Sequence, residues 1–252
     1  MIEVSDLCKE FTLSKKQQKE LNSDQKITKA VENVCFSCQS GRIFSLLGPN
    51  GAGKTTTLRM LATIYKPTSG KIEIAGIDAI KYPQEVRKKI GFLTGSTGLY
   101  ARLTPVELID YFAKLYGVAN HERDERKKYL FDLLNMHDFL NKRIGKLSTG
   151  MKQKVSICRT MIHDPEVVIF DEPTSGLDVI TAGNIIKLIS DCKAQNKTVI
   201  FSSHIMSEVD LLCDELAIIH KGNIKHQGSM SDFRNQMLES NLTAEFIRIV
   251  QS

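Results

Sequence analysis

A glycine-rich turn organises this chain, and it reads Gly48-Pro49-Asn50-Gly51-Ala52-Gly53-Lys54-Thr55-Thr56. Residues 42–47 before it are mostly apolar and predict a strand, whereas residues 54–62 have the pattern of an amphipathic helix. Glycines lack a Cβ atom, so the turn can adopt positive φ angles and point successive backbone N–H groups at an anion. The helix that follows adds the positive end of its dipole. The pattern therefore predicts a phosphate-binding turn between a strand and a helix.

The spacing of this turn follows the pattern Gly-x-x-x-x-Gly-Lys-Thr of a P-loop, which holds the phosphates of a nucleoside triphosphate. Lys54 can reach the β- and γ-phosphates, and the Thr55 hydroxyl is placed to ligate Mg²⁺. Thr56 follows at the position expected for the α-phosphate. The alternative is a glycine-rich turn with no ligand, and the complete spacing in this context argues against it. We therefore expect polyphosphate and Mg²⁺ to bind at residues 48–56.

Two adjacent acids end a second apolar segment. Residues 167–170, Val-Val-Ile-Phe, are typical of a parallel strand buried on both faces. Asp171 and Glu172 follow, at the edge where open α/β sheets bind ligands. Two carboxylates at the end of a buried strand are costly unless they serve a ligand. We expect Asp171 to hold Mg²⁺ through its water shell and Glu172 to polarise the attacking water as catalytic base, with a structural capping role for one acid as the alternative.

A further strand, predicted over residues 198–201, is followed by polar residues that end in His204. A single histidine after a strand is most often structural. Here, however, two other predicted strands also end in polar groups beside the same expected site. That position favours contact between His204 and the γ-phosphate. The expected catalytic groups are Lys54, Glu172 and His204.

Length and composition describe an ordinary globular protein. The chain has 252 residues, 42% hydrophobic and 25% charged, which suits one large α/β domain with a smaller inserted lobe. A net charge of +5 does not by itself indicate a nucleic acid or an anionic membrane surface as partner. No apolar run approaches the roughly 18 to 20 residues that cross a bilayer, and the first residues do not resemble a signal peptide. We therefore expect a cytoplasmic protein.

The N-terminal region predicts strands at residues 2–4 and 31–38, separated by a polar segment, Ser14–Thr28. We interpret that segment as a solvated loop, with lysines that rest on anionic lipid as the weaker alternative. Cys35 and Cys38 are three residues apart in a strand and so face opposite sides, which favours packing over a zinc or redox pair.

The middle of the chain predicts helices. Apolar residues recur at helical spacing over residues 104–140, with Thr104 as the expected cap and Pro105 in the first turn. No strand pattern interrupts this region, so we expect a helical lobe inserted into the α/β core. Short strands are predicted at residues 71–75, 90–93, 215–219 and 224–227, and the last residues contain one short helical pattern.

A further motif resembles a known family. Leu147-Ser148-Thr149-Gly150-Met151-Lys152-Gln153 precedes a predicted helix and resembles the signature sequence of ABC ATPases, the nucleotide-binding subunits of ABC transporters. Asp171-Glu172-Pro173-Thr174, the loop 175–178 and His204 follow in the order of that family, so the resemblance covers residues 2–228. Within the family the chain looks most like ATPase subunits of bacterial sodium- and drug-extrusion systems, judging from residues 91–100 and 203–209.

The resemblance implies a fold: a P-loop NTPase (RecA-like) core with an N-terminal antiparallel β region and an inserted α-helical lobe. It implies one ATPase domain over residues 1–230, in which 1–94 and 163–230 form the core and 95–162 the lobe. Residues 231–252 would be a short C-terminal extension.

The resemblance also implies a mechanism with ATP and Mg²⁺. Two copies would close head to tail, each holding ATP between its own Gly48 turn and the signature of its partner, with the nucleotide-contacting positions Leu147, Ser148, Thr149, Gly150 and Asp178. Phe11 alone suggests core packing, but the family places a base-stacking aromatic there. A separate transmembrane permease would be the other partner, with the chain at the inner face of the membrane and export as the direction.

The chain departs from the family pattern at several positions. A loop glutamine that ligates Mg²⁺ and contacts the membrane subunits is replaced by Gly95, so water, Thr94 or Ser96 would have to take its place. Thr149 and Met151 stand where Gly and Gln are commoner.

Two other functions compete with this one. An ATP-dependent switch on nucleic acid or ribosomes is the alternative class, but such proteins usually carry two cassettes or a long coiled-coil insertion, so no nucleic acid is expected. A GTPase is disfavoured because residues 196–199, Asn-Lys-Thr-Val, lack the Asp that would recognise guanine.

Overall fold

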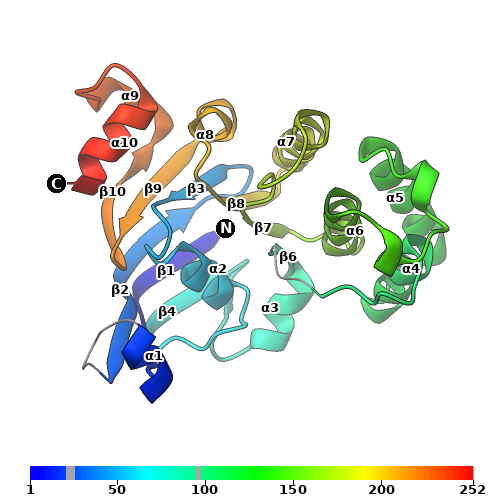
Figure 1. Cartoon of the computed structure of the whole chain (residues 1–252), viewed down its shortest axis with the longest axis horizontal. Coiled ribbons are helices and arrows are strands. Elements are labelled where there is room, and N and C mark those ends of the chain that lie inside the picture. Colours follow the sequence, from blue (N-terminus) through cyan, green and yellow to red (C-terminus); the bar gives the residue numbers. More distant parts are fainter. Residues whose placement is uncertain (21–25, 95–97, 252) are drawn as a thin grey trace.

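The computed structural model describes residues 1–20, 26–94 and 98–251, and a six-stranded sheet lies at its centre (Figure 1). The strand order is β10-β9-β3-β8-β7-β6, with parallel pairing from β9 to β6 and an antiparallel β10 at one edge. The strands are β3 (Ile43–Leu47), β6 (Ile90–Leu93), β7 (Val167–Asp171), β8 (Thr198–Ser203), β9 (Glu215–His220) and β10 (Asn223–Ser229). The predicted α/β core is confirmed.

Three central strands bring their carboxyl ends to one edge of this sheet. Every residue of β3, β7 and β8 is buried, as expected for strands covered on both faces. The register pairs Leu47 with Ser203 and Asp171 with Ser202. The glycine-rich turn, the two acids and His204 therefore all leave the sheet at the same edge.

A second sheet is formed near the N-terminus. Its order is β2-β1-β4-β5, and all of its pairs are antiparallel. The strands are β1 (Ile2–Thr12), β2 (Ile27–Cys38), β4 (Ser69–Ile74) and β5 (Ile77–Asp78). This confirms the predicted antiparallel region. Cys35 is exposed and Cys38 is buried, as their offset in the strand predicts, and both are free thiols.

Helix α2 (Lys54–Leu61) joins the two sheets through one hydrophobic cluster. Leu58 and Leu61 of the helix belong to the same cluster as Ile2 of β1 and Ile169 of β7. Burial of this apolar face anchors the helix, so its first turn stays fixed at the carboxyl edge of the sheet. A short helix α3 (Pro83–Lys89) then leads into β6.

Three helices gather at one side of the molecule, away from the C-terminal helices (Figure 1). They are α4 (Pro105–Leu115), α5 (Asn120–Leu133) and α6 (Thr149–Met161), with short 3₁₀ turns at residues 137–139 and 144–146. Thr104 caps α4 as predicted, because its side chain accepts from the Glu107 N–H while the Glu107 carboxylate accepts from the Thr104 N–H. The expected helical segment is present, and the exact domain boundaries stay a prediction.

Two regions differ from the expectation. The segment 14–28 is not one loop: β1 and β2 continue to pair as far as Thr12 and Ile27, and α1 (Lys15–Glu20) follows β1. Residues 21–25 lie outside the described part of the chain. The sequence pattern did not show the ends of β1 and β2, because the residues there are mostly polar. The backbone hydrogen bonds that pair two exposed strands do not require apolar side chains.

The C-terminal region contains two helices where one helical pattern was expected. They are α9 (Met230–Gln236) and α10 (Leu242–Gln251), and they follow α7 (Val179–Ala194) and α8 (Met206–Leu212) in the chain. Ser229 caps α9 by accepting from the Asp232 N–H. A helix of two turns is too short to show a clear hydrophobic period, which is why the sequence pattern missed it.

Candidate functional site

The glycine-rich turn has the conformation that its composition predicts. Gly53, the N-cap of α2, has φ +113°, and Gly51 has φ +77°. A Cβ atom at Gly48 would lie 2.3 Å from the Ile219 carbonyl oxygen, so only glycine fits there. No side chain caps the start of α2, so its first N–H groups are available to bind an anion. The cradle fits a polyphosphate.

Lys54 supplies the cation of this cradle. Its ammonium is buried and donates to the carbonyl oxygens of Gly48 at 2.6 Å and Pro49 at 3.2 Å. Burial lowers the pKa of Lys54, and the charges of Glu172 and Asp171 oppose that shift. A lysine that rests on two neutral carbonyls can exchange them for phosphate oxygens, with which it makes stronger charge-assisted hydrogen bonds.

A hydroxyl and a carboxylate meet beside the turn. Thr55 Oγ1 donates to Asp171 Oδ1 at 3.2 Å, and Ser202 Oγ donates to the same oxygen at 2.7 Å. Thr55 and Asp171 are far apart in sequence, and the sheet edge brings them together. Hydroxyl and carboxylate oxygens are the ligands that Mg²⁺ prefers, so these residues fit the expected ion.

Glu172 comes directly after β7 in an unusual backbone conformation. Its φ is +50°, and its N–H donates to Ser202 Oγ at 3.0 Å. One Glu172 carboxylate oxygen lies 3.4 Å from His204 Nδ1. Glu172 is half-buried and His204 is exposed. The base and the histidine predicted from sequence are therefore neighbours.

These groups open onto a cleft of about 410 Å³. Its lining includes Thr55, Asp171 and Glu172, together with residues from the first two turns of α6. Four lining residues were not predicted as site residues from sequence, namely Arg59, Gln153, Ser175 and Leu177. Gln153 had a detectable signal, because it lies one helical turn after Thr149 on the same face. Thr94 also lines the cleft, whereas Gly95 and Ser96 lie outside the described residues.

The signature residues surround the start of α6. Leu147 is buried, Ser148 is exposed, and Gly150 is half-buried in the first turn. Ser148 is the N-cap, and its Oγ accepts from the Met151 N–H at 3.3 Å. The helix start is thus presented to solvent with its hydroxyl in place. A contact with a partner nucleotide stays a prediction.

Phe11 and Asp178 have structural contacts of their own. Phe11 is half-buried, with its ring edge-to-face on Tyr65 at 5.5 Å and Lys9 Nζ 5.1 Å from the ring centroid. Asp178 is the N-cap of α7 and accepts from Thr181 N–H at 2.9 Å, a bond that also lowers the pKa of the carboxyl. Nucleotide contacts of both residues stay predictions.

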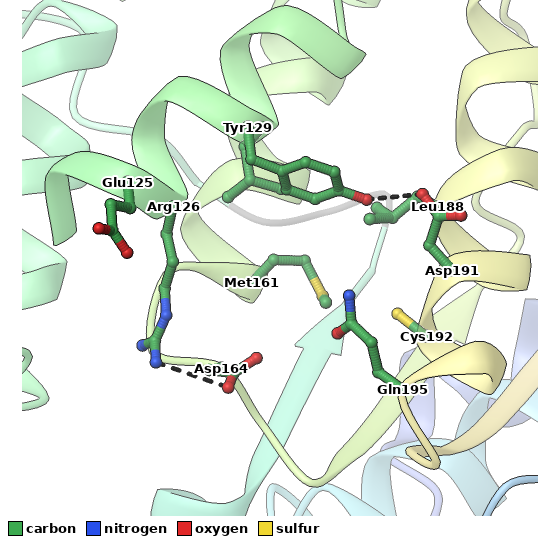
Figure 2. Close-up of a pocket in the computed structure, with 10 residues that line it drawn as sticks. Glu125, Arg126, Tyr129, Met161, Asp164, Leu188, Asp191, Cys192 and Gln195 are labelled. Carbon is green, nitrogen blue, oxygen red and sulfur yellow. Dashed lines mark hydrogen bonds and ion pairs between the residues drawn. The ribbon is translucent and has the colours of Figure 1, made fainter. Parts of the chain in front are cut away.

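A second cavity, of about 240 Å³, lies between α5, the end of α6 and α7 (Figure 2). Tyr129 Oη donates to Asp191 Oδ2 at 2.7 Å across it, and Arg126 lies 3.5 Å from Asp164. No group of His, Cys, Asp or Glu side chains in the described ranges is arranged to hold a metal on protein ligands alone. None of the helices described is long and apolar enough to cross a membrane.

Comparison with known proteins agrees with this geometry. The ABC transporter family matches residues 31–175. The ABC transporter ATP-binding protein NatA of Bacillus subtilis (strain 168) is 44% identical over 82% of this chain and 84% of its own length. The bacitracin transport ATP-binding protein BcrA of Bacillus licheniformis is 41% identical over 78% of this chain and 63% of its own length.

A solved structure of the ATP binding subunit of an ABC transporter superposes with a TM-score of 0.86 at 27% identity, over 99% of both chains. The sequence match and the shared fold cover the phosphate cradle, the acidic strand end and the helical segment together. The chain therefore belongs to the ABC transporter family, in which it is an ATP-binding and ATP-hydrolysing subunit.

Proposed function

We propose that this chain hydrolyses Mg²⁺-bound ATP at the carboxyl edge of its central sheet and thereby energises export through a separate membrane subunit. The observation that carries the proposal is the meeting of the expected groups at that edge. Thr55 is bonded to Asp171 at 3.2 Å, and Glu172 follows with His204 3.4 Å from its carboxylate. These residues come from α2, β7 and the segment after β8.

Each group has a task that its contacts support. Lys54 exchanges the turn carbonyls for β- and γ-phosphate oxygens, and the N–H groups of the turn and Thr56 hold the remaining phosphates. Thr55 and Asp171 would hold Mg²⁺, which supplies positive charge to the phosphates. Glu172 accepts a proton from the attacking water.

His204 has two tasks in this arrangement. Its Nδ1 lies 3.4 Å from a Glu172 carboxylate oxygen, so the imidazole limits the positions that the carboxylate can adopt. More than half of the His204 side chain is exposed to solvent, at 55%, which leaves the ring able to reach the γ-phosphate.

A second copy of the chain completes the site. The exposed Ser148 and the N-terminus of α6 offer a hydroxyl and a helix dipole to the γ-phosphate of a partner. Within one chain, the cleft is partly open to solvent, which leaves room for a partner to cover it. Two copies in head-to-tail order would each contribute one signature and one Gly48 turn.

A membrane subunit supplies the transport path. A groove lined by Phe92 of β6 and by Phe112, Tyr116 and His163 of the helical region offers an aromatic surface for such a subunit. The names of NatA and BcrA indicate transport by these relatives, and bacitracin is the substrate named for one of them. We propose export of a sodium ion or a drug-like molecule, with this chain bound at the inner face of the membrane.

Ser148→Arg tests the composite site. The substitution places a bulky cation at the proposed interface. Ser148 does not itself line the cleft of its own chain, so we expect the ATP affinity of the monomer to stay unchanged. ATP-driven dimerisation and most of the hydrolysis are expected to disappear. Sedimentation with Mg²⁺ and ATP measures the first, and phosphate release measures the second. Glu172→Gln is the positive control for dimerisation, since it slows the hydrolysis that separates the subunits. Normal dimerisation and turnover by Ser148→Arg would rule out the sandwich.

A further inference from the structure

Glu172 is held in a backbone conformation that a glutamate does not choose by itself. Its φ of +50° lies in the left-handed region, which crowds the Cβ atom against the backbone of an L-residue. Such a conformation persists only where the surroundings hold it. Ser202 supplies two restraints on the Glu172 N–H, through Oγ at 3.0 Å and the carbonyl oxygen at 3.2 Å. Both restraints act from β8, on the N-terminal side of the turn.

A third restraint reaches the other side of Glu172 from the helical segment. Gln153 Nε2 donates to the Pro173 carbonyl oxygen at 3.2 Å. The bond crosses from α6 to the residue directly after Glu172. It fixes the plane of the peptide between Pro173 and Thr174. Because the ring fixes the φ angle of Pro173, this bond also restrains the chain directly after Glu172.

The first two turns of α6 contact the same loop at more than one point. Thr149 and Gln153 are one helical turn apart, and both line the cleft beside Glu172. A Cβ atom at Gly150 would lie at ordinary contact distance, 3.8 Å, from Leu177 Cδ2. The loop 172–178 therefore rests against the start of α6, and Gln153 makes the hydrogen bond between them.

We infer that Gln153 is a positioning residue that holds the Glu172 carboxylate of its own chain in the hydrolytic geometry. The inference rests on the proposed function, because it needs Glu172 to be the base. It also says which of the two ATP sites each part of α6 serves. Ser148 begins the helix that serves the nucleotide of the partner, and Gln153 of the same helix serves the base of its own chain.

One consequence is a link between the two ATP sites of a dimer. Gln153 lies five residues after Ser148. When the start of α6 is fixed against a partner nucleotide, Gln153 is fixed with it, and so is the Pro173 carbonyl that accepts its hydrogen bond. Closure on one ATP would then favour the hydrolytic geometry at the other. The link is a hydrogen bond between side chain and backbone, so a single substitution can remove it.

A pair of substitutions separates the hydrogen bond from the packing of the helix. Gln153→Met keeps the length of the side chain and removes the donor, whereas Gln153→Lys keeps a donor that can reach the Pro173 carbonyl. We expect hydrolysis by Gln153→Met to fall roughly tenfold or more, since small displacements of a catalytic group are costly. Gln153→Lys should recover part of the rate. Lys154→Ala, on the same helix, is the matched control and keeps the parent rate.

Mixed dimers then test the direction of the effect. One chain carries Glu172→Gln, so only the other chain can hydrolyse its ATP, and two different affinity tags isolate the mixed species. Gln153→Met is placed either in the chain with the intact Glu172 or in the chain with Glu172→Gln. A positioning role lowers single-turnover hydrolysis only in the first arrangement. The second arrangement keeps the rate of the parent mixed dimer, although its substituted helix completes the working site.

The other outcomes overturn the inference. A loss only in the second arrangement would show that Gln153 serves the partner nucleotide. An equal loss in both would show a general effect on α6, which a lower melting temperature of Gln153→Met would accompany. If wild-type and Glu172→Gln chains form no ATP-dependent dimer, the proposed sandwich fails instead. The rates of the homogeneous Gln153→Met and Gln153→Lys proteins then still decide whether the bond positions Glu172.

Discussion

The nucleotide cleft and the cavity between α5, α6 and α7 show how differently two hollows of one chain can treat their polar groups. Glu172 lines the cleft and has a positive φ angle, and Lys54, next to the lining residue Thr55, rests on two carbonyls. In the other cavity, by contrast, Tyr129 pairs with Asp191 (Figure 2), and the apolar part of the lining is Leu130, Met161 and Leu188.

The difference teaches which kind of hollow carries chemistry. Polar groups of the cleft are held in place but keep capacity for a ligand, and part of the backbone there is in a conformation that costs roughly 1–3 kcal/mol. In the other cavity, Tyr129 is paired with Asp191 and Arg126 with Asp164, and the first of these pairs joins the helical segment to α7. The hollow with paired polar groups is thus a place where elements pack, and at about 240 Å³ it is smaller than the cleft of about 410 Å³.

The largest effect is expected at the base. Glu172→Gln keeps the shape of the side chain but cannot take up a proton, so hydrolysis should fall by about 10²–10³-fold while ATP binding stays nearly intact. A closed dimer should accumulate with ATP. Phosphate release and calorimetry measure the two properties. Hydrolysis close to the parent rate would remove Glu172 from the mechanism.

Lys54→Ala should act on binding. The substitution removes the only charge from a cradle of backbone N–H groups, and charge-assisted hydrogen bonds contribute about 1.5–3 kcal/mol, so ATP affinity should fall about ten- to hundredfold. Calorimetry with Mg²⁺-ATP measures the affinity. Lys114→Ala on the exposed face of α4 serves as control. An unchanged dissociation constant for Lys54→Ala would contradict the assignment.

Phe11→Leu distinguishes base stacking from core packing. Leucine keeps the apolar volume next to Tyr65 and removes the aromatic face. Stacking of a base on an aromatic ring contributes roughly 1–3 kcal/mol, so ATP affinity should fall about fivefold or more while thermal stability changes little. Affinity for inorganic tripolyphosphate, which has no base, should stay constant. Loss of stability with unchanged ATP affinity would instead assign Phe11 to the core.

The smallest effect is expected in the second cavity. Tyr129→Phe removes the hydrogen bond to Asp191, which lowers the free energy of unfolding by about 1 kcal/mol and leaves hydrolysis unchanged. Tyr111→Phe, on an exposed face of α4, is the matched control. Denaturant titration measures the stability. A loss of hydrolysis in Tyr129→Phe at full stability would mean that the two hollows are coupled.

The same bond predicts a pH dependence. Burial, and then the hydrogen bond to Asp191, raise the pKa of Tyr129 above its ordinary value. The contribution of the tyrosine is therefore complete below the unfolded pKa of about 10 and is lost as pH rises from there. The stability difference between the parent and Tyr129→Phe should shrink above that pH. A constant difference across the alkaline range would contradict the shift.

Much of the site was predictable because it depends on local rules. A P-loop needs glycine at the strand-to-helix turn, with Lys and Thr directly after it, and these requirements concern neighbours in the chain. Asp171 and Glu172 end an apolar strand, a pattern that local sequence also shows. The polar ends of β1 and β2 and the short helix α9 escaped the same reasoning, because their hydrogen bonds do not require an apolar period.

The sequence by itself indicated the glycine-rich turn, the two acids, the histidine and most of the strands, since backbone conformation and burial pattern act over a few residues. Only the tertiary structure decided which distant groups touch. Ser202 lies beside Asp171 because β7 and β8 pair in that register, and Gln153 reaches the Pro173 carbonyl because α6 packs beside the end of β7. Contacts of this kind depend on the packing of whole elements, whose relative positions no local pattern records.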